Sequence, residues 1–296
     1  MTDAFSKLHP TVNFIFFAFV IALSMFVMNP VCLVLSLVCA FVNAVYLNGI
    51  KTVKLCLKFI LPMVLLVIII NPVFNHQGVT ILTYFPWENP LTLESIVYGT
   101  ASAALLSSVV LWFSVFNSVI TSDKLIYLFG RIIPSLSLVI SMALRFVPKF
   151  TTQFKNVRNA QRCIGRDISD GSVIKRIKNG IRIISIMLSW SMENAIETAD
   201  SMKSRGFGLK GRTAYSIYKF DRRDLIVLVI VAVLGISVSI SAITGVIDFN
   251  YYPSIKGNIT DVLSLLTFFL YGILMLIPTI LNAGEGIKWK RLRSAI

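Results

Sequence analysis

Histidine, cysteine and acidic residues are scarce in this sequence of 296 residues, and each scarcity bears on a class of site. The two histidines, His9 and His76, lie in different segments without ligand-spaced partners, which argues against a histidine metal site. The four cysteines form no C-x-x-C pair, and a free cysteine beside an apolar run behaves as a small hydrophobe. We therefore predict neither a disulfide nor a bound metal ion, and no cofactor.

Acidic side chains are also missing from the interiors of the apolar runs. Glu94 and Asp261 lie at the ends of such runs, and Asn43 is the most notable polar residue within one. Membrane transporters that work alone usually carry buried ion pairs or acidic relays. The lack of such groups argues against a self-contained proton-coupled pump.

Long apolar runs are abundant: hydrophobic residues make up 56% of the chain, and the mean hydropathy is +0.78. Because a helix of about 20 apolar residues crosses a bilayer, we predict an all-α membrane protein with about six transmembrane helices. The predicted spans are residues 12–28, 31–47, 59–74, 95–116, 225–246 and 262–281. The first span runs directly into the second without a small-residue cleavage site, so we do not expect a cleavable signal peptide.

The distribution of Lys and Arg predicts the orientation of these spans, because cytoplasmic loops collect cations. With both termini in the cytoplasm, 27 of the 28 Lys and Arg residues fall inside, and Lys256 alone falls outside. We expect a cytoplasmic loop to carry Lys51, Lys54 and Lys58. The predicted organisation is spans one to four in residues 1–116, a cytoplasmic segment in 117–223, and spans five and six with a basic tail in 224–296.

The cytoplasmic segment, residues 117–223, contains two long amphipathic patterns. Apolar residues recur at spacings of three and four over 147–164 and over the second half of 173–203, which places them on one face of an α-helix in each case. Gly165 ends the first pattern and Gly206 the second, because glycine adopts the left-handed cap conformation at low cost. Two long cytoplasmic helices, each ending at a glycine flanked by cations, are therefore predicted.

The apolar stretch at residues 132–144 is too short to cross a bilayer. We expect it to lie at the membrane interface or to pack under the spans. Whether residues 117–145 are interfacial or re-entrant stays open.

Two further patterns permit other interpretations. Residues 206–211 read GFGLKG, a literal G-x-G-x-x-G, but the dinucleotide fingerprint needs a strand before it, and here a helix precedes it. Asp167 and Asp170 form a D-x-x-D pair, which in an enzyme acting on a phosphorylated membrane lipid holds Mg²⁺ against a diphosphate. The alternative is a solvated turn that caps the next helix at Asp170 or Ser172. A basic ridge beside the first helix suits anionic lipid, and we expect no nucleic-acid partner.

Three short motifs follow one another in the central segment: ALRFVP at residues 143–148, AQRCIG at 160–165 and SRG at 204–206. In this order they resemble the coupling helices of the transmembrane T-component of energy-coupling factor (ECF) transporters, the family that includes the cobalt-transport membrane subunits. The resemblance covers residues 120–215 best. The second motif is expected to read A-Q-x-x-R-G, and Ile164 stands where its arginine is expected.

The resemblance implies a non-catalytic scaffold in the plasma membrane of a prokaryote. Such a scaffold binds two ABC-type ATPase subunits through its helix ends and a small substrate-binding membrane subunit through its spans, for uptake of a vitamin or a metal ion. The residues it implies for ATPase docking are Arg162, Ile164, Gly165, Arg166, Ser204, Arg205 and Gly206. Those it implies for support of the coupling helices are Arg145, Pro148, Ala160, Gln161 and Gly208. The transported substrate, the stoichiometry and the choice of Arg162 or Arg166 as replacement cation stay open, as does a conventional ABC permease.

Overall fold

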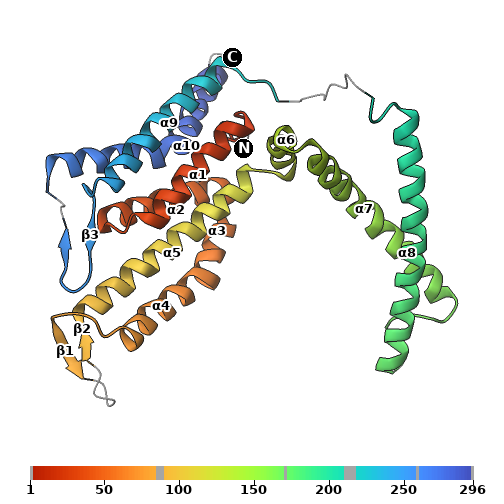
Figure 1. Ribbon diagram of the computed structural model, residues 1–296, viewed down its shortest axis with the longest axis horizontal. Helices are drawn as coiled ribbons and strands as arrows, with labels where there is room; N and C mark the ends of the chain where they lie inside the picture. The colour runs from red at the N-terminus through yellow and green to blue at the C-terminus, as the bar shows by residue number, and fades with distance from the viewer. Residues whose placement is uncertain (1–2, 85–89, 170–171, 210–217, 258–259, 295–296) are drawn as a thin grey trace. The chain divides into compact units, whose positions relative to one another are not determined.

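The computed structural model describes residues 3–84, 90–169, 172–209, 218–257 and 260–294 (Figure 1). The chain divides into two compact units. Met1–Leu125 and Tyr218–Ile296 form the first, called the bundle unit here, and Ile126–Ile217 form the second, called the central unit. The all-helical class predicted from the sequence is confirmed.

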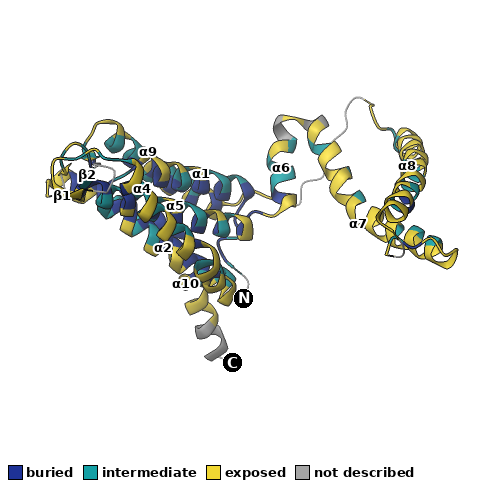
Figure 2. Cartoon of the chain, turned by 90° about the horizontal axis from the view of Figure 1, so that it is seen from below, coloured by how far each residue is buried: buried dark blue, intermediate teal, exposed yellow. Residues whose placement is uncertain are grey.

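Apolar helices build the bundle unit. They are α1 (Pro10–Phe26), α2 (Pro30–Asn48), α3 (Ile50–Leu55) continuing through a π-helical turn (Cys56–Ile60) into α4 (Leu61–Phe74), α5 (Leu93–Val119), α9 (Arg222–Ile243) and α10 (Val262–Ser294). Five described helices are long and apolar enough to cross a membrane, counting Ile50–Phe74 as one, and α1, at 17 residues, is slightly shorter. Many large apolar side chains of these helices are exposed, for example Val34, Leu66 and Val233, as a lipid-facing surface requires. Figure 2 shows exposed residues along the outer faces of these helices.

The prediction that a loop carries Lys51, Lys54 and Lys58 is wrong, because these lysines lie on a continuous helix, Ile50–Phe74. Gly49, with a φ of +56°, makes the whole connection from α2 to α3, so the helix starts earlier than the apolar run does. A helix of 25 residues is about 37 Å long, and the hydrocarbon core of a bilayer is about 30 Å thick. The helix is therefore about 7 Å longer than the hydrocarbon is thick, so the turn with Lys51 and Lys54 can extend beyond it.

Buried polar contacts tie four helices together inside the bundle. The hydroxyl oxygens of Ser24 on α1 and Ser36 on α2 lie 2.9 Å apart, and Trp112 on α5 donates its ring N–H to Ser36 Oγ over 3.1 Å. Asn43 Oδ1 on α2 accepts a hydrogen bond from the Thr279 hydroxyl on α10 over 3.0 Å. Polar groups away from water must find such partners inside the protein, so these contacts fix how the helices pack.

One end of the bundle gathers the connections that contain short strands. The antiparallel pairs are β1 (Ile81–Tyr84) with β2 (Pro90–Thr92), and β3 (Phe249–Asn250) with β4 (Lys256–Gly257). The Tyr251 hydroxyl donates to Met28 O over 2.8 Å, and Asn75 Nδ2 donates to Tyr252 Oη over 2.9 Å, so the connections after α1, α4 and α9 lie together. These strands are short additions that the all-helical prediction did not include.

The opposite end of the bundle gathers the N-terminal segment and the polar ends of α5, α9 and α10. Phe5 N–H donates to Asn282 Oδ1 on α10 over 3.1 Å, and His9 N–H donates to Asp224 Oδ1 on α9 over 3.2 Å. The Lys124 ammonium donates to Val119 O over 2.9 Å, just after α5. The N-terminal segment, the end of α5, the start of α9 and the second half of α10 therefore meet at one end of the bundle.

Three helices form the central unit and its first junction: α6 (Ser122–Ile132), α7 (Pro134–Cys163) and α8 (Val173–Ser204). The second amphipathic helix, predicted over 173–203, is confirmed almost to the residue. The first is longer than its pattern, because residues 134–144 of the apolar stretch form the beginning of α7, while Ile132 ends α6.

Candidate docking ends of helices α7 and α8

Helices α7 and α8 end in the same backbone arrangement. At the end of α7, Gly165 N–H donates to Arg162 O over 2.9 Å and Arg166 N–H donates to Gln161 O over 3.0 Å. Gly165 has a φ of +74°, in the left-handed region that favours glycine. This pair of hydrogen bonds around a left-handed glycine is the Schellman motif, which satisfies carbonyl groups that the helix leaves without partners.

The end of α8 repeats the motif residue for residue. Gly206 N–H donates to Lys203 O over 3.0 Å, Phe207 N–H donates to Met202 O over 3.0 Å, and Gly206 has a φ of +79°. The Ser204 hydroxyl turns back onto the helix and donates to Ser201 O over 2.9 Å. The capping glycines predicted from the sequence are therefore confirmed at both helices.

Superposing the two motifs by position reveals an exchange that sequence reasoning missed. Ile164, at the C-cap of α7, corresponds to Arg205 at the C-cap of α8, and Arg166 corresponds to Phe207. The cation and the apolar side chain thus change places across the glycine. Ile164 is 65% exposed and Phe207 is 43% exposed, so both ends present an apolar group to the surface. Reading the two capping glycines as aligned positions would have revealed this from the sequence.

Asp167 lies in the turn between α7 and α8, and its carboxylate and main-chain carbonyl contact other residues of the central unit. Its carboxylate lies 3.6 Å from Arg162 Nε and 3.9 Å from Arg158 Nε, and it accepts from the Ser169 hydroxyl over 2.7 Å. Its main-chain carbonyl accepts from the buried Asn179 side chain on α8 over 3.0 Å. The Ser169 hydroxyl, with a smaller contribution from Arg158, holds the pKa of this carboxyl below its ordinary value. Asp167 therefore anchors the start of α8 to the end of α7.

These contacts of Asp167 distinguish Arg162 from Arg166, the two candidates to replace the arginine expected at Ile164. Arg162 is engaged by Asp167, whereas Arg166 is exposed and forms no ion pair within the described part of the chain. Asp170, the other half of the D-x-x-D pair, lies outside the described residues. Among the residues that the structure describes, no group of three or more His, Cys, Asp or Glu side chains could hold a metal ion.

The remaining predicted residues are dispersed along α7 and just beyond α8. Arg145 and Pro148 are exposed on α7, and Pro148 O accepts from the Thr152 hydroxyl over 3.1 Å. Ala160 and Gln161 lie in the last turn of α7, where Gln161 Oε1 is buried without a described hydrogen-bond partner. Gly208, with a φ of +96°, continues the turn after the α8 cap.

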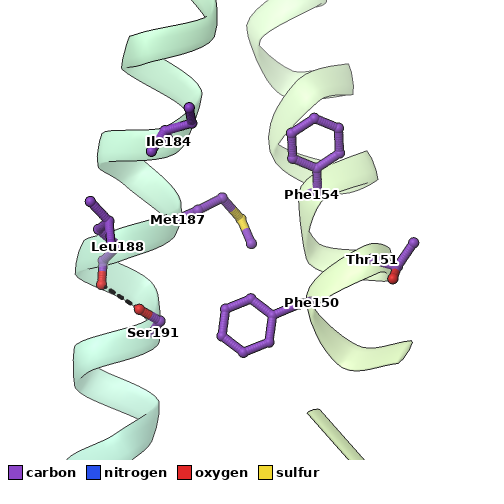
Figure 3. Close-up of a pocket in the computed structure, with 7 residues that line it drawn as sticks. All are labelled: Phe150, Thr151, Phe154, Ile184, Met187, Leu188 and Ser191. Atoms are coloured by element: carbon purple, nitrogen blue, oxygen red, sulfur yellow. Dashed lines mark hydrogen bonds between the residues drawn. The ribbon is translucent and has the colours of Figure 1, made fainter. Parts of the chain in front are cut away.

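An apolar groove lies where α7 and α8 pack on each other (Figure 3). It has a volume of about 430 Å³ and is lined by Phe150, Thr151, Phe154, Ile184, Met187, Leu188 and Ser191. Phe150 packs its ring edge-on against Trp190, with centroids 5.3 Å apart. Exposed Ile184, Leu188 and Met192 continue the apolar surface along α8. An apolar surface of this extent is typical of a binding face for another protein.

Helices long and apolar enough to span a membrane, together with a separate pair of long amphipathic helices with exposed, matched ends, define the class as a helical membrane protein. The family model described as cobalt transport protein (CbiQ) matches residues 2–215, and the chain belongs to that family. The family resemblance drawn from the central segment is thereby confirmed.

Individual relatives carry related names. The "Energy-coupling factor transporter transmembrane protein EcfT" of Lactobacillus helveticus is 41% identical over 97 residues, which cover 32% of this chain and 35% of the relative. The corresponding protein of Lactococcus lactis is 34% identical over 102 residues, covering 34% of this chain and 38% of the relative. The match therefore spans little more than a third of the length of these two relatives. The "EcfT 1" of Listeria monocytogenes is 27% identical over 207 residues, covering 64% of this chain and 76% of the relative.

Proposed function

We propose that this chain is the non-catalytic transmembrane component of an ECF-type importer. It would couple ATP hydrolysis by two cytoplasmic ATPase subunits to a separate membrane subunit that binds a vitamin or a metal ion. The observation that carries the proposal is the pair of long amphipathic helices with matched, exposed caps. Family membership and the names of the relatives support it.

Arg205 is the residue we assign to the first ATPase contact. It lies at the C-cap of α8, is exposed, and forms no ion pair within the described residues. A guanidinium group can bind a carboxylate through two parallel hydrogen bonds, which gives both strength and direction. An acidic groove on an ATPase subunit is therefore the partner surface that fits this end.

The end of α7 needs a different partner surface. Ile164 takes the C-cap position, and the free cation, Arg166, follows the glycine. We assign the second contact to an apolar pocket that receives Ile164 with an acidic group beside it for Arg166. The contact between Arg162 and Asp167 would then support this end without touching the ATPase.

We assign the apolar groove of the central unit, together with the outer faces of the bundle, to the substrate-binding membrane subunit. The groove is lined by side chains that are mostly apolar, and the exposed Met192 extends it. The few polar groups on it suit a membrane protein partner better than a soluble one. The bias of Lys and Arg supports a cytoplasmic position for the central unit and both termini.

The test is affinity purification of the tagged full chain from its native membrane in mild detergent, as wild type and as Arg205→Glu. We expect two ATPase chains and a small hydrophobic protein with the wild type, and loss of the ATPases with the variant. Lys155→Glu is the matched control, because Lys155 is an exposed cation on α7 away from both caps. Equal recovery of the ATPases with Arg205→Glu and the wild type contradicts the assignment.

A further inference from the structure

A second groove lies in the bundle unit, apart from the docking ends. It has a volume of about 510 Å³ and is lined by Lys7, Arg223, Ile280, Leu281, Gly284, Glu285, Lys288 and Trp289. It lies at the polar end of the bundle, between the N-terminal segment and the ends of α9 and α10. Neither the fold nor the docking of ATPases requires such a site.

The charges of this groove favour an anion. Arg223 Nη1 lies 2.9 Å from Glu285 Oε1, so this pair is neutral overall and holds α9 against α10. Lys7 and Lys288 are exposed and form no ion pair within the described part of the chain. Two positive charges that the protein does not neutralise are therefore directed at one groove.

The lining of the groove changes along α10 from apolar to basic, as a phospholipid changes along its length from apolar acyl chains to a charged headgroup. Ile280, which is 56% exposed, and Leu281 form an apolar wall on the side of the membrane-spanning part of the helix. Lys288 lies two turns further along, beside Trp289, which is 58% exposed. Tryptophan is enriched at the level of lipid headgroups, and basic pockets between transmembrane helices bind anionic headgroups.

Gly284 leaves room for the ligand between the apolar wall and the lysines. A Cβ atom built on it meets no atom within 4 Å, so the space above it is open. The same is true of Gly286, which lies on the same helix but does not line the groove.

We propose that this groove is a binding site for an anionic phospholipid of the membrane in which the bundle lies. The acyl chains lie along Ile280 and Leu281, and the phosphate binds between Lys7 and Lys288. The site goes beyond the transport function proposed above and depends only on the bundle spanning a membrane.

The proposal is tested by titrating the detergent-purified full chain with phosphatidylglycerol or phosphatidylcholine and counting bound lipids by native mass spectrometry. We expect a clear preference for phosphatidylglycerol in the wild type. Because each cation near a membrane surface contributes about fivefold to binding of anionic lipid, Lys7→Gln with Lys288→Gln should weaken binding about 30-fold. Equal binding of the two lipids, or no effect of the double variant, overturns the proposal.

A pair of glycine variants separates the groove from the general charge of the surface. Gly284→Leu fills the groove and should abolish the preference, whereas Gly286→Leu adds the same side chain outside it and should leave the preference intact. Soluble glycerol phosphate, which has the anion without the acyl chains, should not displace the lipid at equal concentration. Displacement at equal concentration, or equal effects of the two glycine variants, contradicts a lipid site.

Discussion

Exchanging the cation and the apolar residue across one helix cap tests the docking proposal without changing the charge of the protein. The variant Arg205→Ile with Phe207→Arg gives α8 the order isoleucine, glycine, arginine that α7 already has. The glycine, its left-handed φ and the number of arginines all stay the same. Any effect on the partners therefore reports the positions of the cation and of the apolar side chain, and not the net charge.

The magnitude follows from how far the cation moves. Two residues span at most about 7 Å, so an arginine that met a carboxylate at about 4 Å is displaced to about 10 Å from it. At an effective dielectric constant of about 20, the attraction falls from about 4 to about 2 kcal/mol. A loss of about 2 kcal/mol is about a 30-fold weaker association.

The assay is binding of the purified ATPase subunits to the full chain immobilised in detergent, compared between wild type and exchange variant. Exchanging Lys155 and Asn156 is the control, because it moves an exposed cation by one residue on α7, away from both caps. The reasoning is refuted if the cap exchange binds the ATPases as tightly as the wild type does, or if the control loses as much affinity as the cap exchange.

Three further predictions concern stability. Ser36→Ala leaves the Trp112 ring N–H without its partner inside the bundle and should cost about 1 kcal/mol in thermal unfolding in detergent; an unchanged melting temperature would contradict this contact. Gly206→Ala forces alanine to a φ of +79° and should destabilise by about 1 kcal/mol, whereas Gly180→Ala, inside α8 with open space around it, should stabilise by a similar amount; the same sign for both would refute the cap. The lowered pKa of Asp167 means that its contribution is present above the ordinary carboxyl pKa of about 4 and is lost as the pH falls through the folded value, so hydrogen exchange at the start of α8 should rise only under acid. An increase already near neutral pH would contradict this.

Elements that depend on the spacing of residues within one stretch of the chain could be predicted from the sequence. Helix α8 follows from apolar residues at spacings of three and four and from a glycine that can adopt a left-handed φ, both of which lie within one stretch of chain. The membrane spans follow from the length of the apolar runs. The helix at Lys51–Lys58 was missed because charge was read as loop, although lysines on one face of a helix end are compatible with a span that is longer than the hydrocarbon is thick.

Contacts between distant residues could not be predicted in this way. Ser36 and Trp112 are 76 positions apart, and nothing in the sequence near either one specifies the other. The role of Asp167 likewise depends on Asn179, which donates to its main-chain carbonyl from 12 positions away. Its carboxylate is engaged by Ser169 and Arg162 and is therefore not a free ligand for magnesium. The sequence left that choice open because a D-x-x-D pair looks the same whether its oxygens are free or already bound.

The two caps show where geometry adds to motif reading. In the motif alone, Ile164 stands where an arginine is expected, so the end of α7 looks incomplete. Once Gly165 and Gly206 are aligned through their identical hydrogen bonds, each end is seen to present one cation and one exposed apolar side chain in opposite order. A partner groove that needs one cation and one apolar side chain in either order would bind both ends. A groove whose acidic group lies opposite the C-cap would bind Arg205 and reject Ile164. If the docking proposal holds, the two ends therefore select partner surfaces that differ in where the acid lies, and the cap exchange at α8 should create two ends of the α7 kind.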